Sequence, residues 1–78
     1  MAVRRCQVVL EWDADESVWV TYVPALNHLS TYGATKEAAL EETWEAILGY
    51  IEASKKEKLP LPDFDGTVEL TEVEIAIA

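Results

Sequence analysis

Only one segment of the chain has the period of an α-helix, and this restricts the fold more than any other feature. From Lys36 to about Lys56 apolar residues recur every three or four positions, and Thr35 before them is a good N-cap. A single helix can cover only one face of a sheet, so the pattern predicts one helix packed on one sheet. The apolar stripe of this helix consists of Leu40, Trp44, Ile47 or Leu48, and Ile51.

Trp44 lies in the middle of this stripe, where helical spacing normally points a side chain into the core. We therefore expect its indole ring to be largely buried against the sheet. On that expectation, replacement by alanine removes about 3–5 kcal/mol of stability, which in so small a domain can abolish folding.

Two segments before the helix have the two-residue period of strands. Residues 5–12 alternate in polarity, and Val18–Val23 is rich in β-branched and aromatic residues until Pro24 ends it. The polar link at residues 13–17 is short, which predicts an antiparallel hairpin. Residues 30–32 can form a short third strand before the helix.

The C-terminal residues 67–77 are again strand-like, although their alternation slips near Thr71. They follow a proline-rich connector at residues 59–62 that can be neither helix nor central strand. The expected fold is therefore α+β, a small antiparallel sheet with one long helix in the order β-β-β-α-β. With 78 residues the chain has room for one domain, residues 1–78.

The second strand is apolar on both faces, and a single helix leaves one of them uncovered. That face carries either Val18, Val20 and Tyr22 or Trp19, Thr21 and Val23, and the sequence does not decide between the two sets. With one cysteine and one histidine, no intrachain disulfide or Cys/His metal site can support the domain. We therefore expect self-association, most simply a homodimer. The residues expected to mediate it through strand pairing are Val73, Ile75 and Ile77.

The charge of the chain limits its partners. Fifteen acidic residues against six basic ones give a net charge of −9, which repels phosphate backbones and acidic membrane surfaces. We expect no direct nucleic-acid binding, no membrane binding and a basic protein as partner. No signal peptide or membrane span is evident, and the lone thiol suits a reducing compartment, so the expected location is the cytoplasm.

Candidate chemistry is sparse, and we expect neither catalysis nor a cofactor. The run Asp13-x-Asp15-x-Ser17 begins like a calcium loop, but Val18 and Pro24 stand where Gly and Glu are needed. A two-metal cluster needs carboxylates from separate strands, which one turn does not supply. His28 has no patterned nucleophile beside it, and Cys6 alternates with core residues as a small buried hydrophobe.

The order of motifs resembles that of the HicB-type antitoxins. Residues 15–26, DESVWVTYVPAL, are similar to the family's hairpin, with Trp19 at the aromatic position and Pro24 and Leu26 at its Pro-x-Leu. Residues 32–40, YGATKEAAL, resemble the family's helix start, and residues 59–62, LPLP, resemble its proline-rich exit. Asn27-His28 replaces the usual Pro-Gly, and Ser17-Val18 replaces the paired glycines.

This resemblance implies a partial ribonuclease-H-like fold, homo-oligomers and a basic, RNA-cleaving HicA-type toxin as partner. It does not imply promoter binding, because residues 63–78 are too few for the DNA-binding module usual in full-length relatives. Two alternatives remain, an orphan relative that only self-associates and a degenerate ribonuclease-H-like nuclease. The residues assigned to contact a partner are Asp13, Asp15, Glu16, Trp19 and Thr21.

Overall fold

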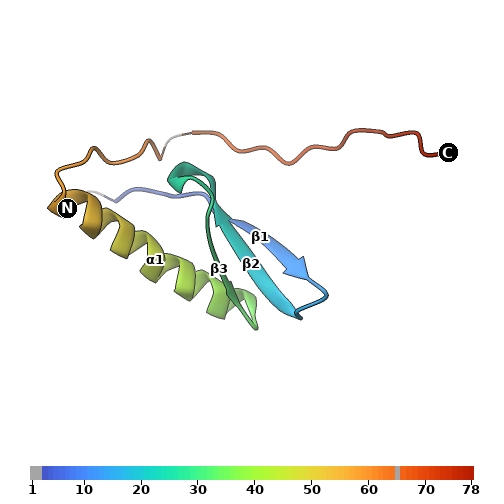
Figure 1. The fold of residues 1–78 in the computed structure, drawn as a ribbon, viewed down its shortest axis with the longest axis horizontal. Coiled ribbons are helices and arrows are strands. Elements are labelled where there is room, and N and C mark those ends of the chain that lie inside the picture. The colour runs from blue at the N-terminus through green and yellow to red at the C-terminus, as the bar shows by residue number, and fades with distance from the viewer. Residues whose placement is uncertain (1–2, 65) are drawn as a thin grey trace.

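The computed structural model describes residues 3–64 and 66–78 and shows an α+β fold. A three-stranded antiparallel sheet has the order β1-β2-β3, with β1 at Val9–Asp13, β2 at Val18–Val23 and β3 at Leu29–Gly33. A short 3₁₀ turn, η1 (Pro24–Leu26), links β2 to β3, and one long helix, α1 (Lys36–Lys56), follows (Figure 1). The predicted hairpin, third strand and helix are confirmed, although β1 begins later than the alternation from residue 5 suggests.

Local chemistry explains where α1 begins and ends. The Thr35 hydroxyl accepts a hydrogen bond from the backbone N–H of Ala38 at 3.0 Å, which satisfies one of the unpaired donors of the first turn. Glu37 in the first turn and Lys55 and Lys56 in the last turn complement the helix dipole. The predicted N-cap and helix bounds are thus confirmed.

The two turns of the sheet are held by short polar side chains and left-handed backbone. One carboxylate oxygen of Asp13 accepts the backbone N–H groups of Asp15 at 3.0 Å and Glu16 at 3.2 Å. After η1, Asn27 and His28 have φ of 55° and 60°, a region that asparagine tolerates better than most residues. These two residues reverse the chain so that β3 returns beside β2.

The face of the sheet that α1 covers carries Thr21 and Val23, which answers the question that the sequence leaves open. Both side chains are fully buried, and Thr21 meets Thr43 of the helix. The hydroxyl oxygens of Thr21, Thr31 and Thr43 lie within 2.6–2.8 Å of one another. The Thr43 hydroxyl also donates to the carbonyl of Ala39 at 2.8 Å, so the cluster has an acceptor outside itself.

The apolar core is small and lies toward the end of the sheet where β2 meets η1. It is built from Val23, Leu26 and Phe64, the last of which follows the helix. Gly33 permits the close approach of α1 to β3, because a Cβ added there would lie 2.5 Å from the backbone nitrogen of Ala39. Partly buried side chains surround this core: Cys6, Val8, Ala25, Leu29, Ile47 and Ile51.

The expected burial of Trp44 is wrong, because its side chain is 62% exposed. α1 packs on β3 and β2 and contacts β1 little, so the sheet does not extend beneath the whole apolar stripe. The buried line of the helix runs instead through Ala39 and Thr43. Trp44 and Leu48 are therefore left exposed beside the sheet, whereas Ile47 and Ile51 of the same stripe pack against the core.

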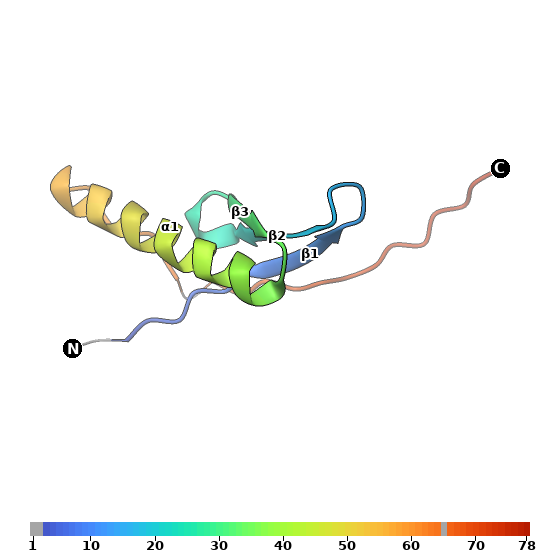
Figure 2. The same cartoon turned by 90° about the horizontal axis from the view of Figure 1, so that it is seen from below.

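Residues 67–78 run extended, without strand pairing, past the tip of the β1–β2 hairpin (Figures 1 and 2). The side chain of Leu70 is 100% exposed. Val73, Ile75 and Ile77 are also strongly exposed. Residues 66–78 thus form no strand, so the expected C-terminal strand is not confirmed, although the backbone N–H of Val68 near the start of this segment contacts the side chain of Gln7.

Candidate protein-binding surfaces

The face of the sheet away from α1, called here the open face, is the first candidate surface. Val18, Val20 and Tyr22 of β2 lie half-buried on it, and Tyr32, the cross-strand neighbour of Val20, is 69% exposed. A shallow cleft of about 310 Å³ crosses this face from the hairpin to β3. Its lining residues are Asp13, Glu16, Val18, Val20, Ser30, Thr31 and Tyr32.

The chemistry of this cleft suits a basic side chain. Its floor is formed by Val18 and Val20, and two carboxylates, those of Asp13 and Glu16, stand at its hairpin end. Lys and Arg bury their aliphatic stems on apolar surface while their charged heads seek acceptors. A carboxylate accepts charge-assisted hydrogen bonds from such heads, so the floor and the acids can bind one side chain together.

The structure separates the five residues that the sequence assigned to partner contact. Asp13, Asp15 and Glu16 lie together in the hairpin turn, next to the cleft. Trp19 points to the opposite face, where its ring centroid lies 5.5 Å from that of Trp12. Thr21 is 0% exposed beneath α1, so it is not accessible to a partner in this conformation.

Trp19 has partners of its own on the helix side of the sheet. The ammonium nitrogen of Lys36 lies 4.8 Å from the centroid of the Trp19 ring, within the range of a cation–π interaction. Since Lys36 is the first residue of α1, this contact ties the start of the helix to the end of the hairpin. The role of Trp19 shown by the structure is thus a contact within the chain.

The second candidate surface is an apolar groove between α1 and the chain that leads into β1. It has a volume of about 500 Å³ and includes the exposed helix side chains Leu40, Trp44 and Leu48. Sequence reasoning missed this groove because it treated the whole helical stripe as core. The remaining lining residues are Arg4, Cys6, Val8, Thr43, Ile47 and Ile51.

Cys6 and His28 differ in their surroundings. Cys6 is half-buried and lines the groove, and this burial raises the pKa of its thiol. A raised pKa keeps the thiol protonated and weakly nucleophilic near neutral pH. His28 is exposed in the turn between η1 and β3. Within residues 3–64 and 66–78, no three His, Cys, Asp or Glu side chains lie close enough together to hold a metal ion.

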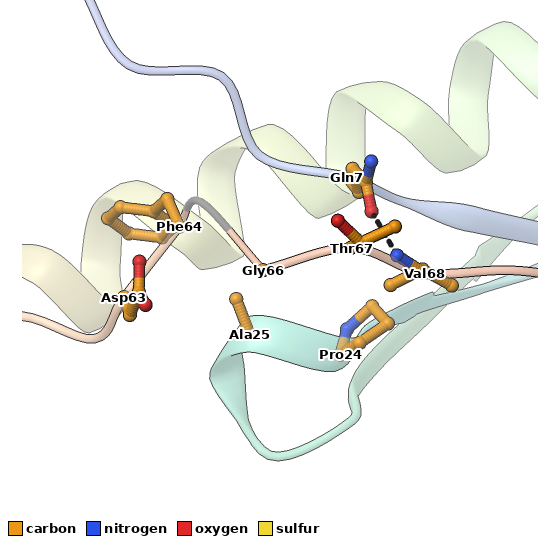
Figure 3. Close-up of a pocket in the computed structure, with 8 residues that line it drawn as sticks. All are labelled: Gln7, Pro24, Ala25, Asp63, Phe64, Gly66, Thr67 and Val68. Carbon is orange, nitrogen blue, oxygen red and sulfur yellow. Dashed lines mark hydrogen bonds between the residues drawn. The ribbon is translucent and has the colours of Figure 1, made fainter.

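A third hollow lies where the chain leaves Phe64 and runs along the outside of η1 (Figure 3). It measures about 170 Å³, and across it the backbone N–H of Val68 donates to the side-chain oxygen of Gln7 at 3.1 Å. The Arg4 guanidinium carbon lies 6.0 Å from the centroid of the Phe64 ring. These contacts fix the start of the C-terminal segment beside the residues that lead into β1.

Comparisons with protein-family models, with curated proteins and with solved structures find no match to this chain. Among the described helices, none is long and apolar enough to cross a membrane.

Proposed function

We propose that this chain is a non-enzymatic, HicB-like antitoxin-type module whose open face binds a basic protein. The observation that carries the proposal is the cleft in which the apolar floor of Val18 and Val20 ends at the carboxylates of Asp13 and Glu16. Such a site takes a Lys or Arg side chain of a partner, and Tyr32 beside it offers the exposed aromatic surface typical of protein interfaces.

The net charge of −9 supports the same class of partner. An acidic surface attracts a basic protein over several ångströms and speeds its association at low salt. A toxin that cleaves RNA is itself basic, because it must bind phosphate backbones. The antitoxin would neutralise it by covering the surface that its RNA substrate needs, without acting on RNA itself.

The finer fold that we propose is the partial ribonuclease-H-like arrangement β-β-β-α-β. The observed order of three antiparallel strands followed by one helix supports it, and the alternating residues 73–77 would supply the last strand. The same order would serve an orphan relative that only self-associates. The exposed groove beside α1 favours this second candidate function, because it is an apolar surface separate from the open face.

The proposal is tested by capture of a partner from the native host with the tagged, full-length chain. A basic protein of low mass should be retained at low salt and released at high salt. Asp15→Lys with Glu16→Lys should abolish its capture, because the two substitutions reverse the charge of the hairpin. Glu52→Lys with Glu57→Lys is the matched control, since both positions are exposed near the far end of α1 and should retain the partner.

A second readout tests inhibition. The captured protein, produced alone, should cleave RNA and stop doing so when the purified chain is added in equimolar amount. Capture that survives the hairpin charge reversal, or a captured protein without effect on RNA, would contradict the antitoxin role.

A further inference from the structure

We propose that the groove beside α1 receives the C-terminal segment of a second copy of this chain, so that two molecules exchange residues 73–77 as an added strand. This inference goes beyond the antitoxin role and does not depend on it. The single molecule contains the two required parts. One is an apolar groove near an open sheet edge, and the other is an exposed, extended apolar segment that pairs with no strand.

The acceptor side is formed by β1 and α1. β1 is an edge strand, with β2 on one side and no strand on its other side among the described residues. Leu10 and Trp12 face the helix side of the sheet, because their cross-strand partners Thr21 and Trp19 do. Cys6 and Val8, which line the groove, lead directly into this edge, so a strand added along it would place alternate side chains toward the groove.

The donor side is the segment from Val73 to Ile77. Val73, Ile75 and Ile77 share one face of an extended chain, and Glu74 lies on the other. Bound at the edge of β1, this segment would bury its aliphatic face in the groove and leave its acid in water. The register is thus specified by the pattern, since a slip of one residue would bury Glu74.

The segment does not fit its own β1. The backbone N–H of Val68 donates to the side chain of Gln7, so each residue of the segment would lie beside the residue 61 positions before it in the chain. Continued in parallel at that offset, the chain would place Glu74 beside Asp13, the last residue of β1, and Ile75 beyond the strand. Like charges placed side by side are destabilising, and Ile75 and Ile77 would lie beyond the end of β1, where there is no strand to pair with.

The direction of the segment also favours a second copy. The groove runs along α1 from Leu40 to Ile51, toward the end of the molecule opposite the hairpin, whereas the C-terminal segment runs past the hairpin (Figures 1 and 2). A two-fold axis would bring each segment to the other molecule's groove. Two chains of net charge −9 repel one another, so the contact between them must be apolar at its centre, with Glu69, Glu72 and Glu74 left in water.

Sedimentation of the full chain at tens of micromolar tests the proposal. We expect the wild type to be a dimer and Ile75→Asp to raise the dimer dissociation constant about tenfold or more, because a buried isoleucine is lost. Ala76→Asp is the matched control, which adds the same charge on the opposite face and should leave the dimer intact. In the groove, Leu48→Glu should weaken the dimer as Ile75→Asp does, and Ala53→Glu, exposed on the same helix, should not.

Cys6 reports on the groove directly, because it lines it. A thiol reagent should modify it slowly in the wild-type dimer and faster in Ile75→Asp, with circular dichroism showing equal helix content in both. A wild-type chain that sediments as a monomer at this concentration would overturn the proposal, and protection of Cys6 in that monomer would show that the segment covers its own groove. A dimer that Ile75→Asp leaves unchanged would overturn it as well.

Discussion

At the scale of single residues, the hydroxyls of Thr21, Thr31 and Thr43 are the polar centre of the contact between sheet and helix. Thr43 is 1% exposed, and its hydroxyl joins both strand threonines to the helix. Buried hydroxyls are stable only while they are hydrogen-bonded, so the three side chains hold α1 at one position over β2 and β3.

Thr43→Val should lower the free energy of unfolding by about 1–3 kcal/mol, because the strand hydroxyls lose a partner inside the protein. The triple variant with valine at 21, 31 and 43 should cost less than the sum of the three single changes, since it leaves no hydroxyl without a partner. Urea denaturation measures both quantities. Equal stability of Thr43→Val and the wild type would mean that water reaches the cluster.

Two glycines provide a matched pair of substitutions. Gly33→Ala should destabilise the fold, because the new Cβ would lie 2.5–2.9 Å from backbone atoms of Ala38 and Ala39. Gly49→Ala should stabilise it by about 0.5–1 kcal/mol, because Gly49 is a helix residue with nothing within 4 Å of an added Cβ. Melting temperatures should therefore shift in opposite directions, and equal shifts would contradict the close packing of α1 on β3.

At the scale of elements, helix α1 has two neighbouring faces with different surroundings. Ala39 and Thr43 pack on the sheet, whereas Trp44 and Leu48 line the groove. Small residues on the first face allow close approach to the strands, as Gly33 does from the other side. The bulky residues then have no sheet beneath them and stay exposed in the single chain.

Trp44→Ala should therefore change the stability of the monomer by only about 1 kcal/mol, far less than expected of a core tryptophan. The measurement is thermal unfolding at a protein concentration below the dissociation constant of the proposed dimer, since association itself adds apparent stability. Val23→Ala serves as the comparison, because that side chain is fully buried. A loss at Trp44 as large as at Val23 would place the tryptophan in the core after all.

The spacing of apolar residues along the sequence was sufficient to predict the hairpin, the third strand and the helix, and the residue type at position 35 predicted its cap. They could not show which face of β2 is covered, because both faces are apolar and the decision depends on the hydroxyls of three separate elements. The error at Trp44 has the same origin, since helical spacing shows which residues share a face but not how far the sheet extends beneath it.

The candidate site was predicted in part. The hairpin acids follow directly from the sequence of the turn, and they do lie together. The cleft beside them could not be foreseen, because it depends on the pairing that brings Tyr32 opposite Val20. Thr21 was assigned to partner contact because both faces of β2 are apolar, so the sequence could not show that Thr21 lies on the buried face.

At the scale of the whole molecule, the central claim is that basic groups bind at the open face and its acidic hairpin. Titration of the isotope-labelled chain with a short Lys/Arg peptide, followed by backbone amide resonances, tests it most directly. We expect shifts at residues 13–20 and 30–32 that vanish at high salt, with residues 44–51 unchanged. Shifts of equal size along the acidic outer face of α1, at Glu41, Glu45 and Glu52, would contradict the claim, because they would show attraction to net charge alone.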